Sequence, residues 1–230
     1  MELNILFEDN HLIAINKRSG DIVQGDKTGD EPLSEKVKRY LKEKYHKPGE
    51  VFLGTIHRLD RPVSGVVLFA KTSKALERMN EKFRSRQVQK TYWAITSGKP
   101  VNETGLLIHY LVKDEAKNKS RAYDAERKGA LRCELEYKVI CYSDRYTLIE
   151  VNPLTGRHHQ IRVQLSTIGC TIKGDLKYGS KRSNTDGSIN LHARKLSFEH
   201  PVTKNIIEIT APVPEDNLWK AMESMATQDS

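Results

Sequence analysis

The chain has 230 residues, 37% of them hydrophobic, so it can bury a substantial core. No stretch approaches the roughly 18 consecutive apolar residues of a membrane span. The first residues are acidic, whereas those of a signal peptide are basic. The three cysteines do not have the spacing of metal ligands or of a disulfide framework. These features argue against a membrane protein and a disulfide-rich secreted protein, and we expect a cytoplasmic protein with reduced thiols.

The formal charge of +8 comes from 38 Lys and Arg against 30 Asp and Glu. The excess is concentrated in four stretches, Lys36–Lys47, Arg78–Lys90, Lys113–Arg132 and Lys173–Arg182. Clustered basic charge is typical of proteins that bind polyanions such as nucleic acid, although a solvated basic surface would have the same composition.

The first half of the chain predicts two strands, a helix, a strand and a second helix. Apolar runs at 5–9 and 12–16 flank Asn10-His11 and predict a β-hairpin. A helix is expected from Pro32 to about Lys47, with its apolar residues at helical spacing. The run Val66–Ala70 predicts a buried strand, and Ser73 is expected to cap a helix whose outer face is basic.

The second half predicts more sheet. Strands are expected at 90–95 and 105–112, followed by a lysine-rich mobile loop at 113–129, a hairpin at 133–142 and 146–151, and a last hairpin at 195–198 and 206–211. A helix with Ile161, Leu165 and Ile168 on one face follows Thr155-Gly156, a polar loop covers 179–188, and Asp216 is expected to start a C-terminal helix. Hairpins with interspersed helices indicate an α+β fold with a mostly antiparallel sheet, in one domain spanning 1–230.

The segment His57-Arg58-Leu59-Asp60-Arg61-Pro62-Val63-Ser64-Gly65 places one carboxylate between two guanidinium groups. Nearby cations favour the ionised form of Asp60, and Pro62 and Gly65 predict a constrained turn. Asp60 is therefore a candidate nucleophile. A structural Arg–Asp pair that closes a loop is the alternative interpretation of this segment alone.

Three further segments carry polar residues that packing alone does not require: Lys90–Ala94, Thr155–Arg162 and Ile172–Gly179. Arg162 lies at the edge of a predicted apolar helix face, and a partly buried Arg needs an acid, for which Asp60 is the candidate. Tyr92 alone would be interpreted as a core residue of its strand. Asp175 is expected to order its own turn, and a role in the pocket is the alternative interpretation.

His158 and His159 are adjacent, and no acid lies at a metal-ligand spacing from them. Helix capping or phosphate contact is therefore favoured over a metal site, and the roles of both residues are left open.

Together these motifs, His-Arg-Leu-Asp-Arg-x-x-Ser-Gly, Lys-x-Tyr-x-Ala, Gly-Arg-x-His-Gln-Ile-Arg and Gly-Asp-x-Lys-Tyr-Gly, resemble the RluA-type family of pseudouridine synthases. The resemblance covers the chain from the first hairpin to about Ala211. It implies a bent, mixed, mostly antiparallel sheet with flanking helices and a central RNA-binding cleft, and isomerisation of uridine to pseudouridine in structured ribosomal or transfer RNA.

The resemblance also implies roles for individual residues. Asp60 corresponds to the catalytic Asp, Tyr92 to the aromatic residue that stacks on uracil and is a candidate for removing the C5 proton, and Arg162 to the Arg that ion-pairs with the catalytic Asp. Leu165 corresponds to a residue that lines the pocket.

Arg58 corresponds to the residue that helps displace the target base from the RNA stack. We group its motif neighbours His57 and Arg61 with it as RNA-contacting residues.

The chain departs from the family pattern at Val63, where Thr is common, and starts without the S4-like domain that many members carry. We therefore expect the catalytic domain alone to hold the RNA. The reaction gains and loses no atom, so no metal, nucleotide or redox cofactor is expected. A monomer is favoured, although the sequence does not determine the oligomeric state.

The sequence is compatible in part with two other classes of protein. A non-catalytic RNA-binding protein would share the charge but gains nothing from a carboxylate facing phosphates, since like charges repel. A metal-dependent nuclease using Asp60, Asp175 and Lys177 would need several clustered acids, whereas the neighbours of Asp60 are arginines. Whether Asp60 attacks the ribose or the base, or deprotonates the ribose, stays open at this point.

Overall fold

The computed structural model describes residues 3–25 and 29–228. The contacts within the chain divide it into two compact units. Unit 1 comprises the residues up to Gln89 together with Ala193–Pro212, and unit 2 comprises Lys90–His192 and the residues from Val213 onward. The organisation as one domain over 1–230 is not decided by this division and stays a prediction. No helix in the described ranges is both long enough and apolar enough to cross a lipid bilayer.

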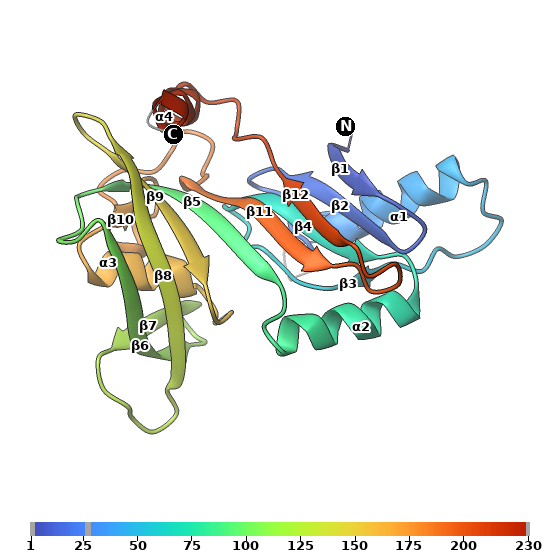
Figure 1. The fold of residues 1–230 in the computed structure, drawn as a ribbon, viewed down its shortest axis with the longest axis horizontal. Helices are drawn as coiled ribbons and strands as arrows, with labels where there is room; N and C mark the ends of the chain where they lie inside the picture. Colours follow the sequence, from blue (N-terminus) through green and yellow to red (C-terminus); the bar gives the residue numbers. More distant parts are fainter. Residues whose placement is uncertain (1–2, 26–28, 229–230) are drawn as a thin grey trace. The chain divides into compact units, whose positions relative to one another are not determined.

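Unit 1 contains the strand order β1-β2-β4-β11, with β3 beside β4 and β12 beside β11 (Figure 1). Its elements are β1 (Ile5–Glu8), β2 (Leu12–Lys17), α1 (Leu33–Lys44), β3 (Gly54–Thr55), β4 (Ser64–Ala70), α2 (Ser73–Arg84), β11 (Leu191–Glu199, from Ala193 onward) and β12 (Ile206–Thr210). The pairs β1–β2, β2–β4, β3–β4 and β11–β12 are antiparallel. The hairpins expected at 5–16 and 195–211 are thus confirmed.

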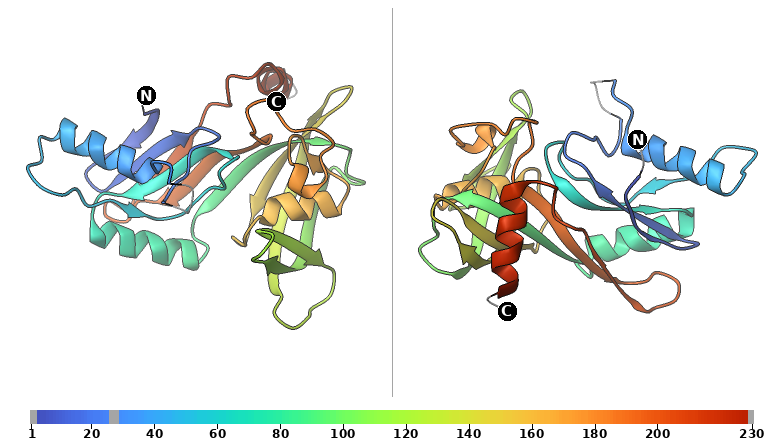
Figure 2. Two further views of the ribbon diagram at one scale, coloured as in Figure 1. Left: turned by 180° about the vertical axis from the view of Figure 1, so that it is seen from behind. Right: turned by 90° about the horizontal axis from the view of Figure 1, so that it is seen from above.

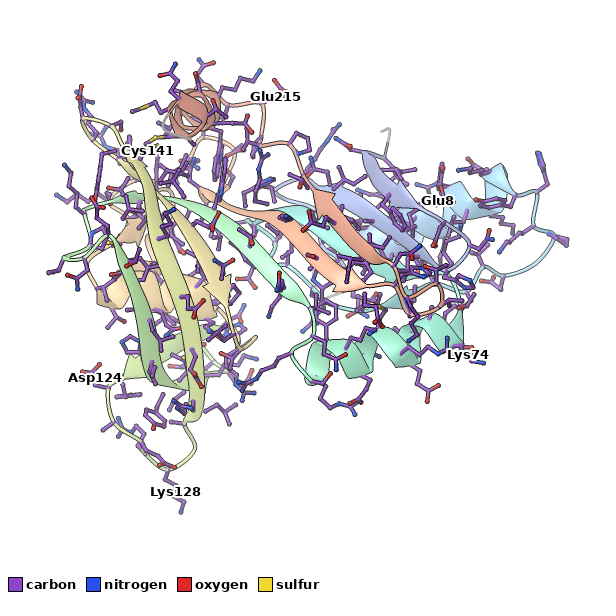
Figure 3. The ribbon with its side chains drawn as sticks, in the orientation of Figure 1. Glu8, Lys74, Asp124, Lys128, Cys141 and Glu215 are labelled. Atoms are coloured by element: carbon purple, nitrogen blue, oxygen red, sulfur yellow. The ribbon has the colours of Figure 1, made fainter. Side chains whose placement is uncertain are left out.

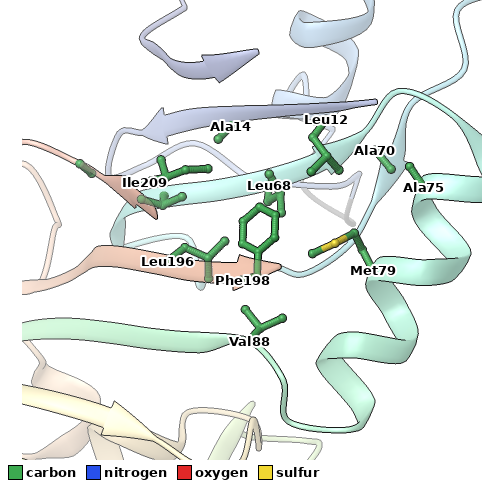
Figure 4. Close-up of a cluster of buried hydrophobic side chains, with 12 residues drawn as sticks. Leu12, Ala14, Leu68, Ala70, Ala75, Met79, Val88, Leu196, Phe198 and Ile209 are labelled. Atoms are coloured by element: carbon green, nitrogen blue, oxygen red, sulfur yellow. The ribbon is translucent and has the colours of Figure 1, made fainter. Parts of the chain in front are cut away.

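The core of unit 1 lies between α2 and the strands. Ala75 and Met79 of α2 pack on alternate residues of β2 and β4, with Phe198 of β11 in the same cluster (Figure 4). The residues between them along β2 and β4 are also buried, so both faces of these two strands are covered.

The start of α2 differs from the prediction by one residue. Thr72, rather than Ser73, is the N-cap: its hydroxyl accepts a hydrogen bond from the backbone N–H of Ala75 at 3.2 Å. Both residue types cap helices well, so the extended backbone of Thr72 decides between them.

Unit 2 contains the strand order β5-β9-β8-β6-β7, with β10 beside β5. Its elements are β5 (Gln89–Ser97, from Lys90 onward), β6 (Thr104–Asp114), β7 (Lys119–Tyr123), β8 (Leu131–Tyr142), β9 (Thr147–Pro153), α3 (Gln160–Thr167), β10 (Thr171–Ile172), the short 3-10 helix η1 (Leu176–Tyr178) and α4 (Asn217–Gln228). The pairs β5–β9, β8–β9, β6–β8 and β6–β7 are antiparallel. The predicted α+β class with mostly antiparallel strands is confirmed.

The loop predicted at 113–129 is wrong in its first part, because β7 lies within it and pairs with β6 from Tyr110↔Tyr123 to Asp114↔Lys119. The sequence Lys-Ser-Arg-Ala-Tyr has no apolar alternation, so its side chains do not predict a strand. Backbone pairing at the edge of the sheet forms it instead. Figure 3 shows Asp124 and Lys128 in the loop that follows.

Helix α3 is buried on all sides from Gln160 to Leu165, where the sequence predicted one apolar face. Ile168 is its C-cap and not part of that face. Val163 packs with Leu111 of β6 and Cys133 of β8, and Figure 2 shows α3 beside these strands from behind. The C-terminal helix predicted from Asp216 is present, and the Asp216 carboxylate accepts hydrogen bonds from the N–H groups of Leu218 and Trp219.

Candidate active site

The turn that carries Asp60 lies at the entrance to β4 in unit 1. The backbone N–H of Val63 donates to the carbonyl oxygen of Asp60 at 3.0 Å and closes the turn. Leu59 and Val63 are buried on either side of Asp60, whereas Asp60 itself is half-buried. The constrained turn expected from the sequence is confirmed, and it holds a carboxylate that solvent can reach.

Lys17 of β2 supports this turn from the protein interior. Its side chain is 1% exposed, and its ammonium donates to the carbonyl oxygens of Arg18, Arg61 and Val63 at 3.0, 3.1 and 2.6 Å. Burial lowers the pKa of Lys17 to about 8, while the negative charges of Asp21 and Asp60 act to raise it and Arg61 to lower it. The positive field at Asp60 therefore includes a buried ammonium that the motif did not predict.

Gly65 explains why the motif ends in glycine. Its φ is +113°, and a Cβ atom there would lie 2.3 Å from the backbone oxygen of Ala193 on β11. Only glycine permits this approach of two backbones at that φ. The positive φ expected at this position is confirmed.

The motif residues around Asp60 make different contacts. His57 accepts a hydrogen bond at Nε2 from the N–H of Leu68, and its ring stacks on Phe83 with centroids 5.1 Å apart. Arg61 is exposed and pairs with Asp30 at 2.5 Å, and Arg58 is exposed. Contact of these three residues with RNA stays a prediction, and His57 has in addition a structural role between β4 and α2.

In unit 2, Arg162 is 5% exposed and forms a two-pronged ion pair. Its Nε and Nη2 donate to the two carboxylate oxygens of Asp175 at 2.7 and 2.9 Å. Asp60 was the acid predicted for Arg162, whereas the acid that binds Arg162 within unit 2 is Asp175. The pairing of Arg162 with Asp60 stays a prediction, because the two residues belong to different units.

The Gln160 side chain fixes the start of α3. Its Oε1 accepts from the N–H of Arg157 and the hydroxyl of Thr155, and its Nε2 donates to the carbonyl oxygen of Glu134 on β8. The Thr-Gly-Arg-His-His-Gln segment is thus tied to the sheet, and Arg162, two residues further along, has a defined position.

The two histidines before α3 do not cap it through their side chains. His159 is the N-cap residue with a φ of +53°, but its Nδ1 hydrogen-bonds the Tyr178 hydroxyl at 2.9 Å. His158 hydrogen-bonds Ser120 and Asn118. Capping through the side chains is therefore wrong: His159 occupies the N-cap position, but the two rings link the start of α3 to η1 and to the β7 region. Phosphate contact stays a prediction.

Tyr92 and Leu165, the other predicted site residues, lie on β5 and α3. Tyr92 is half-buried opposite Val151 of β9, whereas Ala94 and Ile95 further along the strand are fully buried. Tyr92 is therefore more exposed than the core residues of its strand. Leu165 has no exposed surface, and its role in lining a pocket stays a prediction.

Ion pairs change how the basic stretches should be interpreted. Within Lys36–Lys47, four cations pair with acids of unit 1: Lys36 with Asp21, Lys38 with Glu35, Arg39 with Glu31, and Lys44 with Glu8. Much of this stretch is thus neutralised locally. Within residues 3–25 and 29–228, no three His, Cys, Asp or Glu side chains are grouped so as to hold a metal ion.

Sequence reasoning missed Lys17 and undervalued Asp175 and Tyr178. Lys17 could have been found, because it follows Ile13 and Ile15 on the same face of β2, and both are fully buried. Tyr178 is 5% exposed and lies under the Arg162 guanidinium, 5.2 Å from its ring centroid. Asp175 belongs to a quoted motif, but nothing local indicated that its partner would be Arg162.

Comparisons of the sequence and of the structure with known proteins identify the same family. Residues 11–167 match the model of the family described as RNA pseudouridylate synthase. The chain is 34% identical to ribosomal large subunit pseudouridine synthase C of Vibrio vulnificus, over 97% of this chain and 69% of that protein. It is 30% identical to tRNA pseudouridine synthase C of Pectobacterium carotovorum, over 91% and 58%. The solved structure of human RNA pseudouridylate synthase domain containing 4 is similar with a TM-score of 0.79 and 25% identity, over 97% and 93%.

Proposed function

The chain belongs to the RNA pseudouridylate synthase family, and from this premise we propose that it isomerises uridines of structured ribosomal or transfer RNA with Asp60 as the catalytic carboxylate. Family membership identifies an enzyme and so decides against the non-catalytic RNA-binding protein weighed from the sequence. The choice of ribosomal or transfer RNA draws on the relatives, whose names include both substrates. The cytoplasm is the proposed location.

The reaction breaks the bond between C1′ of the ribose and N1 of uracil and forms a bond between C1′ and C5. A proton leaves C5 and a proton is bound at N1, so the atoms balance without another reactant. A carboxylate can add to the sugar or the base and leave again, or it can remove a ribose proton to start an elimination. Asp60 is assigned this role, and each of the three routes requires its carboxylate to be ionised.

One observation carries this assignment. Asp60 is half-buried on a turn whose backbone carbonyls are held by the buried ammonium of Lys17. A reacting group needs access to substrate together with a fixed position, because binding in a defined geometry removes much of the entropic barrier. The Asp60 turn provides both within unit 1.

Arg162 and Tyr92 are assigned supporting roles. A planar guanidinium binds a carboxylate without giving up its proton, so Arg162 is proposed to pair with Asp60 and keep it ionised. Tyr92 is proposed to stack on the flipped uracil and to accept the C5 proton. The exposed cations Arg58 and Arg61 are proposed to contact RNA, since phosphate binding supplies much of the affinity that offsets the cost of extruding a base.

The decisive variant is Asp60→Asn. We expect pseudouridine formation to be abolished, while RNA affinity is unchanged or slightly higher because one negative charge is removed. The measurement is single-turnover conversion of a uridine-labelled RNA transcript, together with the dissociation constant for the same RNA. Asp144→Asn, an exposed aspartate in the β8–β9 turn, makes the same charge change and should retain activity. Turnover in Asp60→Asn beyond that from deamidation to Asp would refute the assignment.

A further inference from the structure

Asp175 is an almost fully buried acid in unit 2 to which the mechanism above gives no role. It is 1% exposed, and both of its carboxylate oxygens accept hydrogen bonds from Arg162. The charge of so deeply buried an acid has to be balanced by a cation or by hydrogen-bond donors. The carboxylate bonds a helix residue 13 positions away in the chain instead of the backbone of its own turn, so the expectation that Asp175 orders its turn does not describe its side chain.

The backbone of Asp175 is fixed without help from its side chain. Its N–H donates to the carbonyl oxygen of Ile172, and its own carbonyl oxygen accepts from the N–H groups of Tyr178 and Ser180. Gly174 before it has a φ of +86°, and a Cβ there would lie 2.7 Å from the backbone oxygen of Ser188. The carboxylate therefore projects from a rigid segment.

This segment is joined to the strand that carries Tyr92. Ile172 of β10 pairs with Thr96 of β5, and the N–H of Lys173 donates to the carbonyl oxygen of Ile95. The ion pair then joins the same segment to α3. Asp175 thus lies where the two unit 2 elements with predicted site residues are tied together.

The contact also fixes the rotation of the Arg162 side chain. A guanidinium has five N–H donors in one plane, and bonds from Nε and Nη2 to one carboxylate occupy one edge of that plane. The guanidinium carbon lies over the Tyr178 ring, 5.2 Å from the ring centroid. The carboxylate fixes one edge of the guanidinium and the Tyr178 ring lies next to its plane. Together these contacts determine the directions of the remaining N–H bonds.

We propose that Asp175 is a positioning residue for the isomerisation: it fixes the orientation of the Arg162 guanidinium within unit 2 and offsets part of its positive charge. This inference rests on the proposed function, because it assumes that Arg162 serves Asp60. Asp175 touches neither RNA nor the reacting atoms in this account, and its effect passes entirely through Arg162. An ionised carboxylate fixes the guanidinium better than a neutral acceptor does, because hydrogen bonds from Arg to an ionised acid are short and directional.

The test is a double-mutant cycle in the full chain with Asp175→Asn, Arg162→Lys and the double variant. We expect Asp175→Asn to lower the single-turnover rate about 100-fold, the size typical of misplaced catalytic groups, with RNA affinity within about twofold of wild type. In the double variant, the Asp175 substitution should add less than about a threefold loss to that of Arg162→Lys, because the two residues act as one unit. A wild-type rate in Asp175→Asn, or losses that multiply in the double variant, would overturn the proposal.

A matched control separates positioning from folding. Glu8→Gln removes a largely buried, ion-paired acid of unit 1 (Figure 3) and should lower thermal stability while leaving the rate unchanged. If Asp175→Asn does not fold, Asp175→Glu keeps the charge but moves it by one methylene. An Asp175→Glu rate about 10-fold lower with unchanged RNA affinity supports the proposal, and an unchanged rate refutes it. Turnover in Asp60→Asn would instead refute the assignment of Asp60 as the catalytic carboxylate, on which the proposed role of Arg162 depends.

Discussion

Lys17 in unit 1 and Arg162 in unit 2 are both buried cations, and their charges are compensated in different ways. In unit 1, Lys17 is held by three neutral carbonyl oxygens, and burial lowers its pKa to about 8. In unit 2, Arg162 is held by the ionised carboxylate of Asp175. A compact ammonium can bond carbonyls that approach from several directions, whereas a planar guanidinium matches two oxygens of one acid.

The two buried cations differ in how their charge depends on pH. Carbonyl dipoles do not fully replace water around Lys17, so its proton is lost more easily than in water. Arg162 stays protonated throughout the range in which proteins are handled. Lys17 therefore loses its positive charge in mildly alkaline solution, and Arg162 does not.

The largest effect on stability is expected where one partner of the charged pair is removed. Arg162→Met leaves the Asp175 carboxylate buried without its counter-ion and should lower the free energy of unfolding by about 3 to 5 kcal/mol. Urea denaturation at pH 7 measures it. The double variant Arg162→Met/Asp175→Leu removes both charges and should recover much of the loss; a single variant as stable as wild type would show that the pair is not needed for folding.

Lys17→Met should change the free energy of unfolding by less than Arg162→Met does, and the size of the change should depend on pH. The pKa of Lys17 is about 8 in the folded protein against an ordinary value of 10.5, so between these values the unfolded chain binds the proton and the folded chain does not. Wild-type stability should therefore rise relative to Lys17→Met as pH increases from 8 to 10.5, by about 3 kcal/mol.

Urea denaturation of wild type and Lys17→Met at several pH values between 7 and 10.5 provides the measurement, and the difference cancels the titration of other groups. A difference that is constant, or that falls with pH, would contradict the assigned burial of the charge.

Glu8 is a third charged group, an acid of β1 in unit 1 that is surrounded by hydrogen-bond donors. Its removal is expected to have the smallest effect on stability of the three. Burial alone would raise the pKa of Glu8, but hydrogen bonds from Lys44, Lys71, Tyr45 and Tyr40 together lower it to about 2. Its contribution to stability is present above pH 4.5 and is lost as pH falls toward 2. Because Lys44 is well exposed, we expect about 1 kcal/mol.

Thermal unfolding of wild type and Glu8→Gln at pH 6 and pH 3 tests this. The two proteins should differ at pH 6, and the difference should be smaller at pH 3, within the range between the two pKa values. Equal unfolding temperatures at pH 6 would show that the Glu8 cluster contributes nothing measurable.

Local sequence determined most of the secondary structure of this protein. The hairpins at both ends, the strand β4 and the helices α1, α2 and α4 follow from the spacing of apolar residues and from turn and cap residues, which act within a few positions of one another. The motifs also singled out Asp60, Arg162 and Tyr92. Where local pattern was weak, as in β7, backbone pairing with a distant strand decided the structure.

Only the tertiary structure decided how the buried charges are compensated. Lys17 meets the carbonyl oxygens of Arg61 and Val63 from 44 and 46 residues away, and Arg162 meets Asp175 across 13 residues and a change of element. A sequence shows that a charge lies on an apolar face, but its partner depends on which elements the fold brings together. Because an uncompensated charge is too costly to bury, that partner has to be supplied by the fold as a whole.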